Sequence, residues 1–178
     1  MIREHPGAAA VTIAGAGNWL VGVDRIGPRV VEAAHGRYGP GVEVRALGSG
    51  ALALLDLLHG QDLLLVVDAC MGQGAPGTVH CYEPELTVVP TTVGSVHQIG
   101  PLETLLVARH FYPETLPLRT LFIAVETEGL DAEAEPDACQ RVIAILDHEI
   151  AAWSWSRRST TEGEGDERDT RAEIGIQS

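Results

Sequence analysis

Short apolar segments alternate with amphipathic ones along the first part of the chain. Residues 8–14 and 63–67 are apolar runs of the kind that form buried strands. Residues 26–34 repeat their apolar positions at helical spacing, which predicts a helix. Residues 42–47 alternate as in a strand nearer a sheet edge, and residues 49–59 predict a second helix. Strands separated by helices of this length are nearly always parallel, so the pattern indicates an α/β domain.

The same alternation continues in the second half. Residues 78–82 and 118–125 predict two further strands, a helix is expected to begin near Pro101, and Pro136 opens a final amphipathic helix. The fold class that we expect is therefore α/β, a three-layer αβα domain. Its sheet is twisted, mostly parallel and five-stranded, with helices on both faces.

Composition sets the expected domain boundary. The amphipathic pattern ends near Trp153, and residues 154–178 are dominated by Ser, Thr, Gly and charged side chains. Such a segment buries too little apolar surface to fold. We therefore expect a single domain over residues 1–153 and a disordered tail over residues 154–178.

Charge and hydropathy exclude several classes of partner. The chain of 178 residues has 12 Lys and Arg against 25 Asp and Glu, a net charge of −13. An acidic surface repels phosphate backbones and anionic lipid, so we expect no nucleic-acid partner and no membrane partner. No apolar run reaches the length of about 18 residues that a membrane-spanning helix needs. No large apolar patch can be read from the helix faces, so a monomer is expected.

The three cysteines, Cys70, Cys81 and Cys139, are widely spaced and form no CxxC pair. This usage fits a reduced, cytoplasmic protein. Cys70 stands beside Asp68 and is a conceivable nucleophile, but no base at a suitable spacing accompanies it. A small buried thiol is the favoured interpretation.

Candidate chemistry gathers where strands end, because ligands of open parallel sheets bind at the carboxyl ends of the strands. Asp24 follows the first strand by a short loop, and Asp68 closes the apolar run 63–67. His97 lies in a loop before a helix. Two carboxylates and an imidazole suit a divalent first-row metal ion with open coordination positions.

Structural alternatives remain open for each of these residues. Asp24 is as well placed to cap the helix that begins near Ile26 as to bind metal. His97 taken singly is more often a hydrogen-bonded loop histidine. Asp68 has the weakest alternative, because a carboxylate that ends an apolar strand needs a cation, a metal or backbone donors. Gly15 and Gly17 do not complete a dinucleotide fingerprint, since Leu20 stands where its third glycine belongs.

Several segments, in order and at matching spacings between Val11 and Trp153, resemble the hydrogenase maturation endopeptidases. They are Gly15-Ala16-Gly17-Asn18-Trp19-Leu20, Asp24 to Val30, Leu64 to Ala69, Pro76-Gly77 and Ser95-Val96-His97. Members of this family remove a short C-terminal extension from the large-subunit precursor of nickel-iron hydrogenase after nickel insertion. The resemblance implies this endopeptidase activity, the precursor as partner, and the nickel that the precursor carries.

The resemblance also implies a role for each candidate. The family's metal-binding and catalytic positions fall on Asp24, Asp68 and His97. Asn18 and Trp19 are weaker candidates for substrate contact, since a turn residue and a packed indole explain them equally well.

Two departures from the family pattern affect substrate choice. Many members carry two adjacent acids after the first strand, whereas here Val23 precedes Asp24 and Arg25 follows it. The segment Ala46 to Gly50 replaces an Asp-Gly-Gly-Thr-like sequence linked to precursor selection. A non-catalytic chaperone that binds nickel or the large subunit is therefore the alternative function. A small-molecule hydrolase on the same scaffold is a weaker one.

Overall fold

A computed structural model of the chain describes residues 9–48, 50–86 and 100–169. The chain divides into two compact units, residues 1–144 and residues 145–178. The first unit contains the sheet and the candidate residues. The single domain over residues 1–153 was expected from composition and remains a prediction.

The first unit is built on a five-stranded sheet with the strand order β2-β1-β3-β5-β4. Its strands are β1 (Val11–Ala16), β2 (Val42–Gly48), β3 (Leu63–Cys70), β4 (Val79–Tyr82) and β5 (Arg119–Glu126). The strands β2, β1, β3 and β5 are parallel, and β4 runs antiparallel to β5. The predicted mostly parallel five-stranded sheet is confirmed, with β2 at an edge as its alternating pattern indicated. The first strand ends at Ala16 rather than at residue 14.

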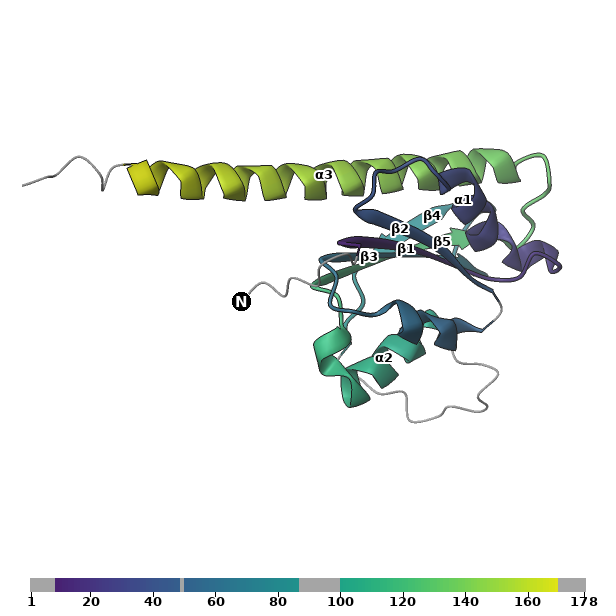
Figure 1. Cartoon of the computed structure of the whole chain (residues 1–178). Coiled ribbons are helices and arrows are strands. Elements are labelled where there is room, and N and C mark those ends of the chain that lie inside the picture. Colours follow the sequence, from purple (N-terminus) through teal and green to yellow (C-terminus); the bar gives the residue numbers. More distant parts are fainter. Residues whose placement is uncertain (1–8, 49, 87–99, 170–178) are drawn as a thin grey trace, which may run out of the picture. The chain divides into compact units, whose positions relative to one another are not determined.

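Helices cover both faces of this sheet. Figure 1 shows α1 (Ile26–Ala34) on one face and α2 (Pro101–Phe111) on the other, together with the 3-10 helix η2 (Ala51–Leu57). Beneath α2 and η2 lies a cluster of buried apolar side chains from both helices and the sheet. Its members include Ala14, Leu54, Leu64, Val66, Leu105 and Phe122.

The segment predicted as a second helix over residues 49–59 takes the tighter 3-10 form. Its buried residues are Ala51, Leu54 and Leu57, each three positions from the next. Since a 3-10 helix has three residues per turn, this geometry aligns all three side chains on one stripe. The three-residue spacing of these buried side chains, rather than the length of the segment alone, explains why it forms a 3-10 helix.

Two glycines bring β1 and α1 into direct backbone contact. A Cβ atom at Gly27 would overlap the carbonyl oxygen of Ala16, and one at Gly15 would overlap the carbonyl oxygen of Gly27. Larger residues would therefore push the helix off the strand. This contact fixes both ends of the loop that carries Asp24.

The helix α3 (Glu135–Asp169) begins next to the predicted Pro136 and crosses the boundary between the two units. In the first unit, Ala138 and Val142 are buried. The second unit continues the helix to Asp169, whereas residues 154–178 were expected to be disordered. Extending a formed helix costs far less than nucleating one, so a polar segment can continue it. Residues 170–178 lie outside the described part of the chain.

No helix within the described ranges combines the length and apolar character that crossing a bilayer requires.

Candidate functional site

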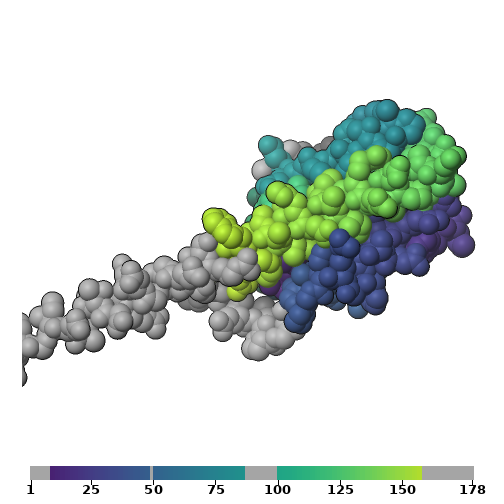
Figure 2. Space-filling model, turned by 90° about the horizontal axis from the view of Figure 1, so that it is seen from above, coloured from purple at the N-terminus to yellow at the C-terminus, as the bar shows by residue number. Residues whose placement is uncertain are grey.

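The acids Asp24 and Asp68 lie at the same edge of the sheet. Asp68 is within β3, and Asp24 follows β1, its parallel neighbour, in which Gly15 pairs with Val67 of β3. Figure 1 shows that the purple loop after β1 and the green loop after β5 reach the same end of the sheet, and Figure 2 shows purple and green atoms at one end of the molecule. Burial is the main cause that raises the pKa of Asp68, and the negative charge of Asp24 adds a smaller rise. The structure thus brings together two of the three predicted residues.

Asp24 is the last residue of the short 3-10 helix η1 (Gly22–Asp24) and is partly buried. Its N–H donates to the carbonyl oxygen of Val21 at 2.9 Å, and its own carbonyl accepts the N–H of Asn18 at 2.8 Å. Gly17 lies against this carbonyl with φ +126°, a conformation that a side chain would strain. Burial raises the pKa of the Asp24 carboxyl, and a backbone hydrogen bond from Asn18 lowers it in part.

The helix-capping alternative for Asp24 is wrong in this structure. The residue that precedes α1 is Arg25, and no side chain makes a capping hydrogen bond there. The Asp24 carboxylate is therefore not committed to a helix terminus.

Asp68 points to the sheet face that α2 covers. Leu64 and Val66 belong to the core under α2, and side chains two positions apart in a strand share a face. One carboxylate oxygen of Asp68 accepts the N–H of Ala69 at 2.8 Å. Burial raises the pKa of Asp68 to about 6, and the charges of Asp24 and Glu103 contribute to this rise.

The third predicted ligand, His97, lies outside the described residues. Among the residues that the structure describes, no three His, Cys, Asp or Glu side chains are grouped as a metal site. Further along the chain, α2 begins at Pro101, and the Glu103 side chain accepts the N–H of Gly100 at 3.0 Å. The set of Asp24, Asp68 and His97 therefore stays a prediction.

The thiol of Cys70 lies beside these acids but is poorly suited to nucleophilic attack. Burial raises its pKa, and the charges of Glu126 and Asp68 raise it further. A thiol held in its protonated form is a weak nucleophile. The structure favours the small partly buried thiol over the catalytic interpretation, and Cys70, Cys81 and Cys139 are all free cysteines.

Sequence reasoning missed Glu126, a fully buried carboxylate at the end of β5. It accepts the N–H of Gln73 at 2.6 Å and that of Glu128 at 2.9 Å. These backbone donors, with others from Gly72 and Gly74, lower its pKa. Glu126 therefore holds the loops that follow β3 and β5. The only signal in the sequence is an acid that closes an apolar strand, the same signal that singled out Asp68.

A second missed residue is Glu135, the first residue of α3. It forms ion pairs with Arg25 and Arg29, and the Arg25 Nε–Oε2 distance is 2.7 Å. Because Arg25 directly follows Asp24, this cluster fixes the chain next to the candidate ligand. The partners Arg25 and Glu135 are far apart in the sequence, so no local pattern could reveal them.

The weaker candidates Asn18 and Trp19 lie on the loop before Asp24. The Asn18 side chain accepts the N–H of Leu20 at 2.9 Å, which is the role of a turn residue. The Trp19 side chain is 48% exposed, and the guanidinium of Arg29 lies 6.0 Å from its ring centroid. Contact of either residue with substrate stays a prediction.

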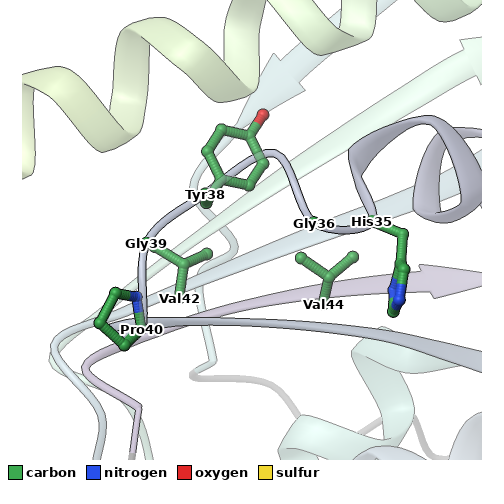
Figure 3. Close-up of a pocket in the computed structure, with 7 residues that line it drawn as sticks. All are labelled: His35, Gly36, Tyr38, Gly39, Pro40, Val42 and Val44. Carbon is green, nitrogen blue, oxygen red and sulfur yellow. The ribbon is translucent and has the colours of Figure 1, made fainter.

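A hollow elsewhere on the first unit does not contain the candidate residues. Figure 3 shows its lining at the start of β2 and the preceding loop: His35, Gly36, Tyr38, Gly39, Pro40, Val42 and Val44. It lies at the amino end of the parallel strands, whereas Asp24 and Asp68 lie at the carboxyl end. With no acid or cysteine in its lining, the hollow offers no comparable ligand set.

The family model and the relative that match this chain both carry the description of a hydrogenase maturation protease. The model of the hydrogenase maturation protease family matches residues 28–144. The hydrogenase 2 maturation protease of Escherichia coli K12 is 32% identical over 150 residues, which cover 76% of this chain and 90% of that protein.

Solved structures with a similar fold are also hydrogenase maturation enzymes. The hydrogenase maturating endopeptidase HybD from E. coli has a TM-score of 0.60 and 28% identity, covering 78% of this chain and 93% of that one. The [NiFe] hydrogenase maturation protease HybD from Thermococcus kodakarensis has a TM-score of 0.59 at 20% identity, covering 78% and 97% of the two chains. The latter similarity demonstrates a common fold.

Proposed function

Since the chain belongs to the hydrogenase maturation protease family and is a hydrolase of the endopeptidase class, we propose the following substrate and reaction. The protein removes the C-terminal extension of a nickel-iron hydrogenase large-subunit precursor after nickel insertion. The observation that best supports this proposal is that Asp24 and Asp68 follow or end neighbouring parallel strands at the carboxyl edge of the sheet, where ligands of such sheets bind.

In this proposal, Asp24, Asp68 and His97 bind the nickel that the precursor carries. Carboxylate and imidazole donors fit a divalent first-row ion. Neither Asp24 nor Asp68 takes part in the ion pairs that Glu135, Glu43 and Glu83 form with arginines in the described part of the chain. A cation from the substrate would therefore meet two carboxylates that no arginine has neutralised, and it would relieve their mutual repulsion.

A divalent ion in such a site polarises a carbonyl or activates water. The chain's own residues position the two carboxylates. Gly17 and Asn18 hold the backbone of Asp24, and the pairing of β3 with β1 and β5 holds Asp68. At neutral pH, Asp68 is mainly ionised despite its raised pKa of about 6, so its lone pairs are available to the metal.

Partner choice is expected to depend on the departures from the family pattern. The segment 46–50 begins with the last three residues of the edge strand β2, where Leu47 is buried and Gly48 has φ +65°. We propose that this changed segment selects a particular hydrogenase precursor. Three free cysteines fit the cytoplasm as the place of action, and the chain is proposed to act as a monomer.

The test is intact-mass spectrometry of a nickel-loaded large-subunit precursor incubated with the protein. The unaltered chain should release a C-terminal peptide, and Asp68→Asn should not. The matched control is Asp56→Asn, which changes an exposed acid on η2 and should leave cleavage intact. A precursor that is bound tightly but never shortened would refute the proposed reaction and support the chaperone alternative. Cleavage that survives in Asp68→Asn would remove Asp68 from the mechanism.

A further inference from the structure

Four apolar side chains project into solvent from the loop that carries Asp24. Their exposed fractions are 48% for Trp19, 92% for Leu20, 44% for Val21 and 45% for Val23. We call these four residues the apolar loop. Single exposed apolar residues are common on protein surfaces, but contiguous groups of them mark interaction sites.

The backbone beneath these side chains is ordered by its own hydrogen bonds. The N–H of Leu20 donates to the Asn18 side chain at 2.9 Å, and the N–H of Val21 donates to the Asn18 carbonyl at 3.1 Å. The N–H of Asn18 reaches across to the carbonyl of Asp24 at 2.8 Å. The loop is therefore a formed turn whose apolar side chains are directed outward, rather than an apolar segment that has failed to pack.

The anchoring of Trp19 supports the same conclusion. The Arg29 guanidinium lies 6.0 Å from its ring centroid, and Arg29 also pairs with Glu135. A cation near an aromatic ring, itself held by a carboxylate, restricts the orientation of the indole. An indole that is restricted and still half exposed loses little conformational entropy on binding.

The position of the loop identifies its occupant. Leu20 is four residues from Asp24, so at most about 14 Å of chain separates them. A protein substrate of ordinary interface size covers about 800 Å² on each partner, a patch of about 16 Å radius. An interface of this size that is centred on Asp24 and Asp68 therefore also covers the apolar loop. Met71, 59% exposed after β3, adds apolar surface at the same edge.

We propose that Trp19, Leu20, Val21 and Val23 dock an apolar segment of the substrate protein next to its scissile peptide. This inference rests on the proposed function and assigns to the loop the part of substrate recognition that does not involve the metal. Leu20 is the main anchor, because it is the most exposed of the four. With a net charge of −13, the protein gains from an apolar contact that holds a partner independently of charge.

The test measures KM and kcat for cleavage of the nickel-loaded precursor by Leu20→Asp, with Val21→Asp as a second variant. KM should rise at least about tenfold, as expected for removing one buried leucine contact, while kcat stays within about twofold. The matched control is Leu118→Asp, since Leu118 is 82% exposed and directly precedes β5, at the amino end of the parallel strands and therefore away from Asp24 and Asp68. Its KM should not change.

The possible failures are distinguishable. If the unaltered protein cleaves the precursor and both loop variants keep its KM, the inference is overturned and the proposed function stands. If the unaltered protein neither cleaves nor binds the precursor, both fail. If sedimentation shows that the unaltered protein self-associates and Leu20→Asp does not, the loop docks a second copy of this chain, which also overturns the inference.

Discussion

Burial and nearby acids disfavour the ionised form of Asp68, so Asp68→Asn should stabilise the metal-free protein above pH 6. Burial, with smaller contributions from Asp24 and Glu103, raises the pKa of Asp68 from 3.8 to about 6. A carboxyl whose pKa is higher in the folded state favours folding while protonated, and this contribution disappears as the pH rises through about 6. Asparagine has nearly the same shape and can accept the 2.8 Å hydrogen bond from the Ala69 N–H, but it is never charged.

The expected size follows from the shift. A rise from 3.8 to about 6 is about two pKa units, and each unit corresponds to about 1.4 kcal/mol, so ionised Asp68 costs at most about 3 kcal/mol at pH 8. For a chain of this length, each kcal/mol changes Tm by about 2–4 °C. Thermal unfolding followed by circular dichroism in a chelator should therefore show a rise in Tm at pH 8 of at most about 6–12 °C. Little change is expected at pH 4, where folded Asp68 is already protonated.

Asp56→Asn is the control, because Asp56 is exposed on η2 and its replacement should change stability by less than about 0.5 kcal/mol. The reasoning is refuted if Asp68→Asn gains nothing at pH 8, or gains equally at pH 8 and pH 4. The same variant should lose precursor cleavage. A substitution that stabilises the fold and abolishes the activity is the expected behaviour of a functional carboxylate.

Three further changes test the geometry. Asp24→Asn should lower the pKa of Asp68, measured by carboxyl NMR titration, because it removes a neighbouring negative charge; an unchanged pKa would separate the two acids. Gly17→Ala should cost more than about 2 kcal/mol in urea unfolding, because φ is +126° and Cβ would overlap the Asp24 carbonyl; near-wild-type stability would contradict that contact. Glu126→Gln should accelerate hydrogen exchange at the Gln73 amide. In the unaltered chain, the lowered pKa of Glu126 means that its carboxylate stabilises the fold above pH 4.5, and that this stabilisation is lost as the pH falls through the pKa of the folded state. If the Gln73 amide of the unaltered chain exchanges fast at every pH, Glu126 does not have this role.

Much of the sheet could be predicted because parallel strands have a simple pattern. The apolar run Leu63–Val67 is buried on both faces, and the alternating β2 lies at an edge. The edge shared by Asp24 and Asp68 follows from strand order alone. The helix that continues to Asp169 did not follow, because a composition poor in apolar residues shows that a segment cannot fold alone, but not that a helix formed before it can extend into it.

The buried charges Glu126 and Glu135 were beyond the reach of sequence patterns for a different reason. Each is stabilised by groups that only the fold brings together. Glu126 accepts hydrogen bonds from backbone amides of two loops, and Glu135 pairs with Arg25, which precedes α1, and with Arg29 of α1. A carboxylate of this kind looks in the sequence like an ordinary exposed acid. For the candidate site, the sequence predicted that Asp24 and Asp68 share one edge of the sheet, but it did not reveal Glu126 and Glu135, which hold the neighbouring chain in place.

The contact between Gly15 and Gly27 limits how this protein can evolve. Where a large side chain meets a small one, a mutation in the first can be compensated by a mutation in the second. Here each residue already has the smallest side chain available, so no compensating substitution exists. Both glycines should therefore be retained through long divergence. The exposed side chains of the loop between them, such as Leu20, are not bound by this constraint, so they can change without moving the carboxylate of Asp24.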